Sequence, residues 1–250
     1  TPQTRLYLYF LFALSIQNIA EISHFYTLAR PGAVPYLEFT VYYAAITVAI
    51  ALLLHMALVL SYPAGHPRVR AAMIAIYLYA AAIEVLLLFT PWIIADLQRI
   101  GYTATRVPGP LYGAFEFYAI GGFLGTIGIL THGVWRQETS LQRVKTSLML
   151  VAIVPMAAVI VTVLTLLHFN IRLFNATVIF PIAITYFLVV TAYAIHQHRL
   201  FDIQFYIPWS KVRARKTAFY NRIRAMIAEI ADLGSVREAA HRLSDTLGCS

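Results

Sequence analysis

The stretch FTVYYAAITVAIALLLHMALVL, from Phe39 to Leu60, contains 22 residues and no charged side chain. Because an α-helix rises about 1.5 Å per residue, about 20 apolar residues are enough to cross a hydrocarbon core of about 30 Å. Five further windows have the same character: Leu6–Leu28, Ala71–Ile94, Leu111–Trp135, Thr146–His168 and Leu173–His196. The sequence therefore predicts an all-α polytopic membrane protein with six visible transmembrane helices.

The composition of the 250-residue chain agrees with a protein that is solvated by lipid. Hydrophobic residues make up 60% of it, charged residues only 12%, and the mean hydropathy is +0.71. Soluble domains carry about 25% charged residues. The single cysteine, Cys249, excludes an internal disulfide framework and a metal site built from several cysteines.

The positive charges lie mostly at one end of the predicted helices. Fifteen of the nineteen Lys and Arg residues fall there, and the other end holds only Arg30, Arg99, Arg106 and Arg172. Since cytoplasmic loops carry an excess of Lys and Arg, we expect both termini of the chain in the cytoplasm. Eight of the basic residues follow Asp202, so the net charge of +8 predicts attraction to an anionic inner leaflet and not to nucleic acid.

A different pattern follows Pro208. Apolar residues recur at spacings of four, three, four and three, as in the seam of a coiled coil: Phe219, Ile223, Met226, Ile230 and Leu233. This pattern predicts a cytoplasmic signalling helix that pairs with a second copy in a homodimer. The alternative is an amphipathic helix that lies on the leaflet.

A second helix is predicted from Ser235, because Ser235 and Glu238 have the spacing of a capping box. We therefore expect three parts: a transmembrane domain over residues 1–207, a linker and coiled coil over 208–234, and the first helix of a further cytoplasmic domain over 235–250. Because the chain starts at Thr1 and stops within a helical pattern, we expect it to belong to a longer protein.

One segment resembles a known family. The stretch YAIHQHRLFDI, from Tyr193 to Ile203, is similar to the end of the N-terminal seven-transmembrane region of bacterial sensor histidine kinases. The segment from Leu52 to Leu60 with Pro63 after it, and the segment from Pro110 to Gly113, are also similar to that family. The resemblance covers Arg5 to Ile207. It implies a seventh span upstream of Thr1, and residues 235–250 resemble the start of a GAF-type domain.

The resemblance implies a membrane-embedded sensor in the bacterial inner membrane, acting in a two-component system. It would relay ligand or membrane-state signals through a dimeric helix to an output module and a response regulator. The coupling residues would be Arg199, Leu200, Phe201, Asp202 and Ile203. The sequence contains no phosphoacceptor helix or ATP-binding motif, so kinase activity would belong to the parent protein. A secondary transporter or small-molecule permease and a membrane-embedded enzyme remain as alternatives, although no internal repeat or catalytic motif favours them.

Several polar side chains lie within the predicted spans. Because ionisable groups inside a membrane are costly, they are candidates for function. We expect an outward-opening pocket for a small hydrophobic or amphipathic ligand, lined by Asn18, Glu21, His24, Glu84, Glu116, Tyr118 and His168. The alternative is a set of hydrogen bonds between helices that only stabilise the bundle.

No cofactor or metal is expected. Haem would need axial ligands, yet no predicted helix carries a spaced pair of histidines. Retinal would need a buried lysine, but the only lysines are Lys145, Lys211 and Lys216, all outside the apolar core. Gly121 and Gly125 have the spacing that permits close contact between helices, either within one bundle or between two copies.

Overall fold

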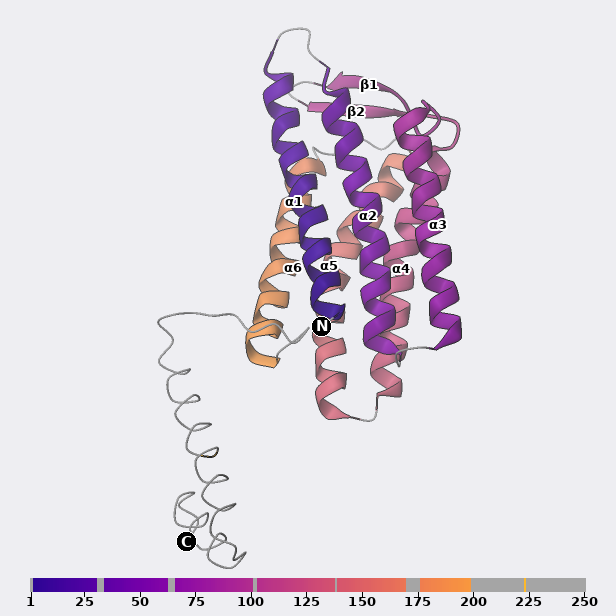
Figure 1. Cartoon of the computed structure of the whole chain (residues 1–250). Helices are drawn as coiled ribbons and strands as arrows, with labels where there is room; N and C mark the ends of the chain where they lie inside the picture. The colour runs from indigo at the N-terminus through magenta and orange to yellow at the C-terminus, as the bar shows by residue number, and fades with distance from the viewer. Residues whose placement is uncertain are drawn as a thin grey trace, which may run out of the picture. The chain divides into compact units, whose positions relative to one another are not determined.

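The computed structural model describes residues 2–30, 34–62, 66–100, 103–137, 139–169, 176–198 and the single residue 223. The chain divides into two compact units, Thr1–Gln204 and Phe205–Ser250. Within the described residues the first unit contains six helices and one β-hairpin (Figure 1). Their bounds are α1 Pro2–Leu28, α2 Tyr36–Ser61, α3 Pro67–Phe89, β1 Ile94–Ile100, β2 Thr103–Pro108, α4 Tyr112–Arg136, α5 Ser140–His168 and α6 Ala176–His198.

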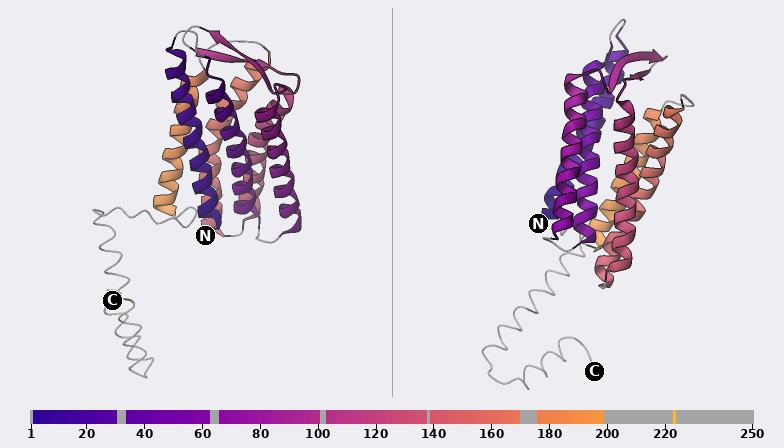
Figure 2. Two further views of the ribbon diagram at one scale, coloured as in Figure 1. Left: turned by 45° about the horizontal axis from the view of Figure 1, so that its top comes forward. Right: turned by 90° about the vertical axis from the view of Figure 1, so that its right-hand side faces the viewer.

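The predicted all-α polytopic fold is confirmed. Five helices, α1 to α5, are long and apolar enough to cross a membrane, and the described apolar part of α6 is the shorter segment Ile182–His196. The helices form two layers, α1 to α3 and α4 to α6 (Figure 2). The central helix is α2, which contacts α1, α3 and α4. The largest fully buried side chains include Phe10, Phe187, Ile50, Leu53, Met56, Leu130, Met149 and Ile153.

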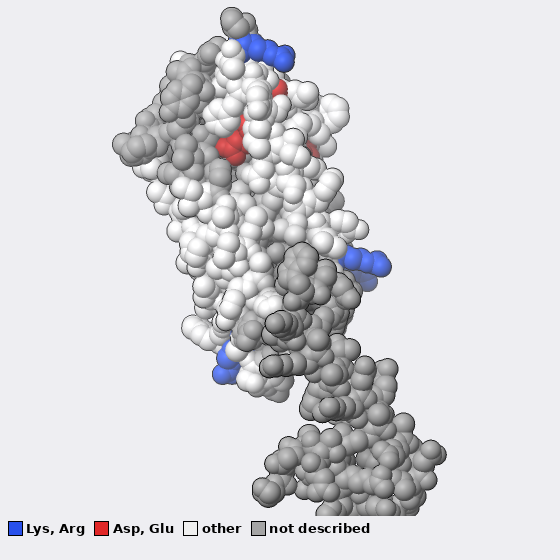
Figure 3. All heavy atoms as spheres, turned by 90° about the vertical axis from the view of Figure 1, so that its left-hand side faces the viewer, with Lys and Arg blue, Asp and Glu red and all other residues white. Residues whose placement is uncertain are grey.

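Apolar side chains also cover the outside of the bundle. Phe117 and Trp135 of α4 and Phe89 of α3 are exposed to 75%, 80% and 78%. On the face shown in Figure 3 most of the surface is uncharged, and the visible acidic side chains lie toward its upper end. An apolar exterior of this kind is what a bundle surrounded by lipid requires, since lipid chains are as apolar as the core.

The prediction that the third span continues to Ile94 is wrong, because α3 ends at Phe89. Thr90 has extended backbone angles of −141° and 153° and directly precedes Pro91. A residue before proline disfavours the helical conformation, which explains the early end. Ile94 instead begins β1, which pairs with β2 in an antiparallel hairpin that the sequence analysis did not anticipate.

The hairpin lies across one end of the bundle, called here the hairpin end (Figures 1 and 2). Its two strands pair in register from Asp96 with Val107 to Ile100 with Thr103. At its base, the Gly109 amide donates to the Ile93 carbonyl at 2.9 Å and the Leu111 amide donates to the Trp92 carbonyl at 2.8 Å. Ile93 is completely buried, so the base of the hairpin is anchored in the core.

Glycines permit the close approach of α4 to α2. A Cβ atom at Gly122 would overlap the side chain of Ile50, and Gly125 lies next to Leu54. A Cβ atom at Gly121 would meet nothing within 4 Å. Close packing within the bundle is therefore observed at Gly122 and Gly125, whereas Gly121 faces away from α2.

The predicted coupling residues Arg199–Ile203 lie outside the described residues. So do four of the five predicted seam residues, and Ile223, the exception, is helical. The boundaries predicted at residues 207 and 234, the dimeric helix and the GAF-like segment therefore stay predictions.

Candidate functional site

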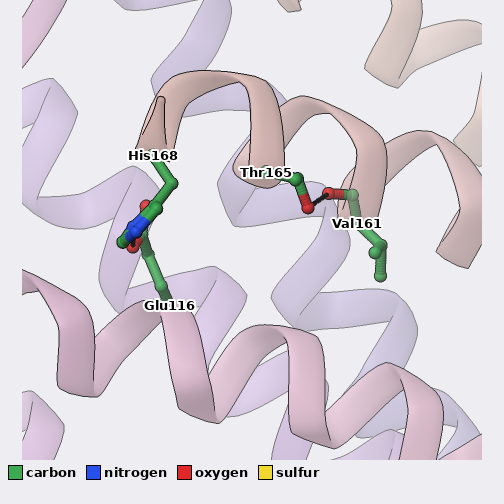
Figure 4. Close-up of polar contacts among 4 residues, drawn as sticks. All are labelled: Glu116, Val161, Thr165 and His168. Carbon is green, nitrogen blue, oxygen red and sulfur yellow. Dashed lines mark hydrogen bonds and ion pairs between the residues drawn. The ribbon is translucent and has the colours of Figure 1, made fainter. Parts of the chain in front are cut away.

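Ionisable side chains from several elements gather at the hairpin end. Glu116 and His168 lie on α4 and α5, and His168 Nδ1 is 2.8 Å from Glu116 Oε2 (Figure 4). The Glu116 side chain is 7% exposed and that of His168 is 62% exposed. This pair therefore joins the start of α4 to the end of α5 and connects a buried carboxyl group with the surface.

Glu116 has further hydrogen-bonding capacity. Its Oε1 atom is buried without a hydrogen-bond partner among the described residues. The aromatic ring of Phe115, the preceding residue, packs against Tyr43 of α2 with ring centroids 5.1 Å apart. A buried acceptor beside aromatic rings is suited to a donor or a cation.

The hairpin contributes a charge to the same place. The guanidinium carbon of Arg106 in β2 lies 4.4 Å from the ring centroid of Tyr112 and 5.7 Å from that of Tyr43. Arg106 also interacts electrostatically with Glu116. From the sequence, Arg106 was expected only as a charge in a loop between two spans. The interleaved Thr, Arg and Val residues after Gly101 were the available signal, because they are typical of a strand.

Glu21 and His24 are both buried near the end of α1, with exposures of 6% and 4%. The His24 ring lies 4.8 Å from that of Phe39 in α2. Within the described residues, neither ring nitrogen of His24 nor Oε1 of Glu21 has a hydrogen-bond partner. Buried polar atoms without a partner in the described part of the chain, on Glu21 and His24, thus lie on α1 at the hairpin end.

The neighbouring residues modify the predicted set. Asn18 is only partly buried, whereas Gln17 is 4% exposed. Gln17, Glu21 and His24 are four and three residues apart and therefore share one helical face. Gln17 was missed, although this spacing was available in the sequence.

Glu84 and Tyr118 form a separate group. The half-buried Glu84 of α3 interacts electrostatically with Tyr118 of α4, whose hydroxyl donates to the Thr47 carbonyl at 2.9 Å. The Tyr79 ring stacks on Tyr118 with centroids 5.4 Å apart. Among the described residues no hydrogen bond or ion pair joins Glu84 to Glu116. The predicted site residues therefore share one end of the bundle but do not form one continuous contact network.

Among the described residues no group of three or more His, Cys, Asp or Glu side chains is placed to hold a metal ion.

A helical bundle with an apolar exterior and buried ionisable side chains at one end defines a polytopic membrane protein with a polar layer. Residues 1–204 match the family described as the N-terminal 7TM region of histidine kinase, and the chain belongs to this family. No curated protein and no solved structure matches the sequence. The chain is therefore a membrane sensor region of the histidine kinase type, and such a region implies a two-component system with a response regulator.

Proposed function

We propose that the hairpin end receives the signal and that the bundle transmits it toward the residues after α6. The observation that carries this proposal is the concentration there of buried polar atoms without partners, on Glu21, His24 and Glu116. Ionisable groups inside a membrane are retained mainly where they serve a function. A small hydrophobic or amphipathic ligand that supplies the absent partners would favour one packing of the helices over another.

Transmission would pass from α6 through residues 199–207 to the coiled-coil seam at 208–234. In this proposal the chain is a homodimer in the bacterial inner membrane with the hairpin end outside. The charge distribution supports this orientation. Among the described residues, the opposite end of the bundle holds six basic side chains: Arg5, Arg68, Arg70, Arg136, Arg143 and Lys145. A shift or rotation of one helix is sufficient if the paired helices have two arrangements of similar energy.

Insertions test the transmission step. The full chain is joined after Ser250 to a histidine kinase module, and one, two, four or seven residues are inserted after Thr217. Insertion of one or two residues should change the rate of autophosphorylation in proteoliposomes. Insertion of seven residues should return this rate to that of the chain without an insertion, because seven residues restore the heptad phase. Identical output at every length would reject a transmitting helix, provided that the unfolding midpoint of the membrane region is constant.

Substitutions test the receiving step. In the same fusion, Glu116→Gln and Glu84→Gln should reduce the response to an activating membrane extract more than they reduce the yield of folded protein. Gln98→Ala, at an exposed position on β1, is the control. Equal losses of response and yield would favour a purely stabilising role for the two carboxyl groups.

A further inference from the structure

Arg106 occupies a site with the chemistry of a cation receptor. Its guanidinium group lies over the ring of Tyr112 and near that of Tyr43, with the centroid distances of 4.4 and 5.7 Å. Aromatic faces attract cations because their quadrupole is negative above the ring, and the attraction strengthens where water is excluded. The two rings come from different helices, α4 and α2, so the bundle itself forms the site.

A carboxyl group completes the receptor. Glu116 is 6% exposed, and its Oε1 atom is buried without a hydrogen-bond partner in the described part of the chain. The Arg106 Nε atom is likewise buried and unpartnered there. Hydrogen-bonding capacity therefore remains in the site while Arg106 occupies it, because Arg106 Nε and Glu116 Oε1 do not hydrogen-bond to each other.

The cation in this site, Arg106, belongs to β2 of the hairpin, whereas the rings and the carboxyl group belong to helices. The Tyr36 hydroxyl also donates a hydrogen bond to Asp96 of β1, and Leu97 and Ala104 of the hairpin are buried. Arg106 is a tethered group, and its departure would loosen β2 while the aromatic rings and Glu116 stay in place on their helices.

We propose that the hairpin end binds an organic cation, a quaternary ammonium or guanidinium group on an apolar scaffold, in competition with Arg106. This inference rests on the proposed sensory role of that end. A bulky, weakly hydrated cation fits aromatic rings and one carboxylate, whereas divalent metal ions require several oxygen ligands. An anionic ligand is disfavoured, because any group that reaches Arg106 also meets the Glu116 carboxylate.

Direct binding tests the competition. The probe is radiolabelled benzyltrimethylammonium, measured by equilibrium dialysis against the full chain in phosphatidylcholine nanodiscs, which carry no net lipid charge. Arg106→Gln should bind the probe about tenfold more tightly than the wild type, because a site held by its own arginine has a lowered apparent affinity. Adding Glu116→Gln to Arg106→Gln should abolish that gain.

Three controls accompany the measurement. Arg106→Lys retains a tethered cation and should bind within about threefold of the wild type. Arg99→Gln removes the same charge from the other strand of the hairpin and should leave the affinity unchanged. Neopentylbenzene, the uncharged isostere of the probe, should not distinguish Arg106→Gln from the wild type.

Hydrogen exchange supplies a second readout. In the wild type the probe should accelerate exchange of the hairpin amides between residues 94 and 108, because displacement of Arg106 frees β2. In Arg106→Gln the same amides should exchange fast already and gain nothing further. A ligand that merely adds contacts would slow the exchange.

The proposal is overturned if Arg106→Gln binds the probe no more tightly than the wild type, or if the probe protects the hairpin in the wild type. If binding and release occur while the kinase fusion does not respond, the cation site stands and the proposed sensory function fails. If the fusion responds to membrane extract but Arg106→Gln shows no gain, the cation inference alone fails.

Discussion

The hydroxyl group of Tyr7 in α1 donates a hydrogen bond to Oγ1 of Thr191 in α6, with the two oxygens 3.0 Å apart and 184 residues apart in sequence. Thr191 donates in turn to the Phe187 carbonyl at 2.8 Å. The rings of Phe10 and Phe187 meet edge to face at 5.5 Å. The first and last helices of the bundle are therefore held together by both a polar and an aromatic contact.

Tyr7→Phe should lower the free energy of unfolding by about 0.6 kcal/mol, the average for hydrogen bonds between helices in membranes. Thr191 still donates to its own helix in this variant. A double-mutant cycle with Thr191→Val, measured by denaturation in mixed micelles, gives the coupling energy. Tyr9→Phe, at a site 60% exposed, is the control. Zero coupling would contradict the hydrogen bond.

Gly122→Ala should destabilise the bundle by about 1–3 kcal/mol, because its Cβ atom would overlap Ile50 and force α4 away from α2. Gly121→Ala, where nothing lies within 4 Å, should be neutral or stabilising by up to about 1 kcal/mol. Ile50→Ala combined with Gly122→Ala should cost less than the sum of the two single changes, since the overlapping atoms are gone. The same denaturation assay measures all of these variants. Equal effects at Gly121 and Gly122 would contradict the packing.

His168→Ala should cost about 1–3 kcal/mol, because it leaves both oxygens of the buried Glu116 without a partner. Glu116→Gln should cost less, since an amide still bonds to the exposed imidazole. The control is Thr165→Val. In the described part of the chain the Thr165 hydroxyl bonds within α5, to the Val161 carbonyl at 2.7 Å, so the change should stay within about 0.5 kcal/mol (Figure 4). Chemical denaturation at neutral pH checks the order of the three variants.

The hairpin should loosen in acid. The hydrogen bond from Tyr36 and then that from the Leu97 amide hold the pKa of Asp96 below its ordinary value of 3.8. A lowered folded-state pKa stabilises the native state above pH 3.8, and this stabilisation is lost as the pH falls through the lowered value. The melting temperature of the wild type should therefore exceed that of Tyr36→Phe at pH 6, and the difference should shrink below about pH 4. A difference that grows in acid would contradict the assignment.

Hydropathy predicted the helical framework because lipid imposes a length and a composition on every span. It failed at the end of α3, where the apolar character continues to Ile94 but the backbone cannot stay helical before Pro91. The hairpin was missed for a related reason. Lipid imposes no length on two short strands of seven and six residues outside the spans, so hydropathy gave no signal for them.

The sequence predicted which polar residues lie at one end of the bundle, but not which of them contact each other. The polar residues of α1, α4 and α5 could be assigned to one end from their distance to the helix termini. The pairing of Glu116 with His168 depends on the rotation of α4 and α5 about their axes, which average hydropathy does not determine. Arg106 was assigned to a loop by charge counting, because its position over Tyr112 depends on the unforeseen hairpin.

The narrow base of the hairpin has a mechanical consequence. A Cβ atom at Gly109 would overlap the backbone of Pro91 and Trp92, and two backbone hydrogen bonds staple the chain there. The two strands thus leave the bundle side by side at this close backbone contact, which fixes the spacing between the end of α3 and the start of α4. A movement of the hairpin about this base would therefore not pull α3 and α4 apart.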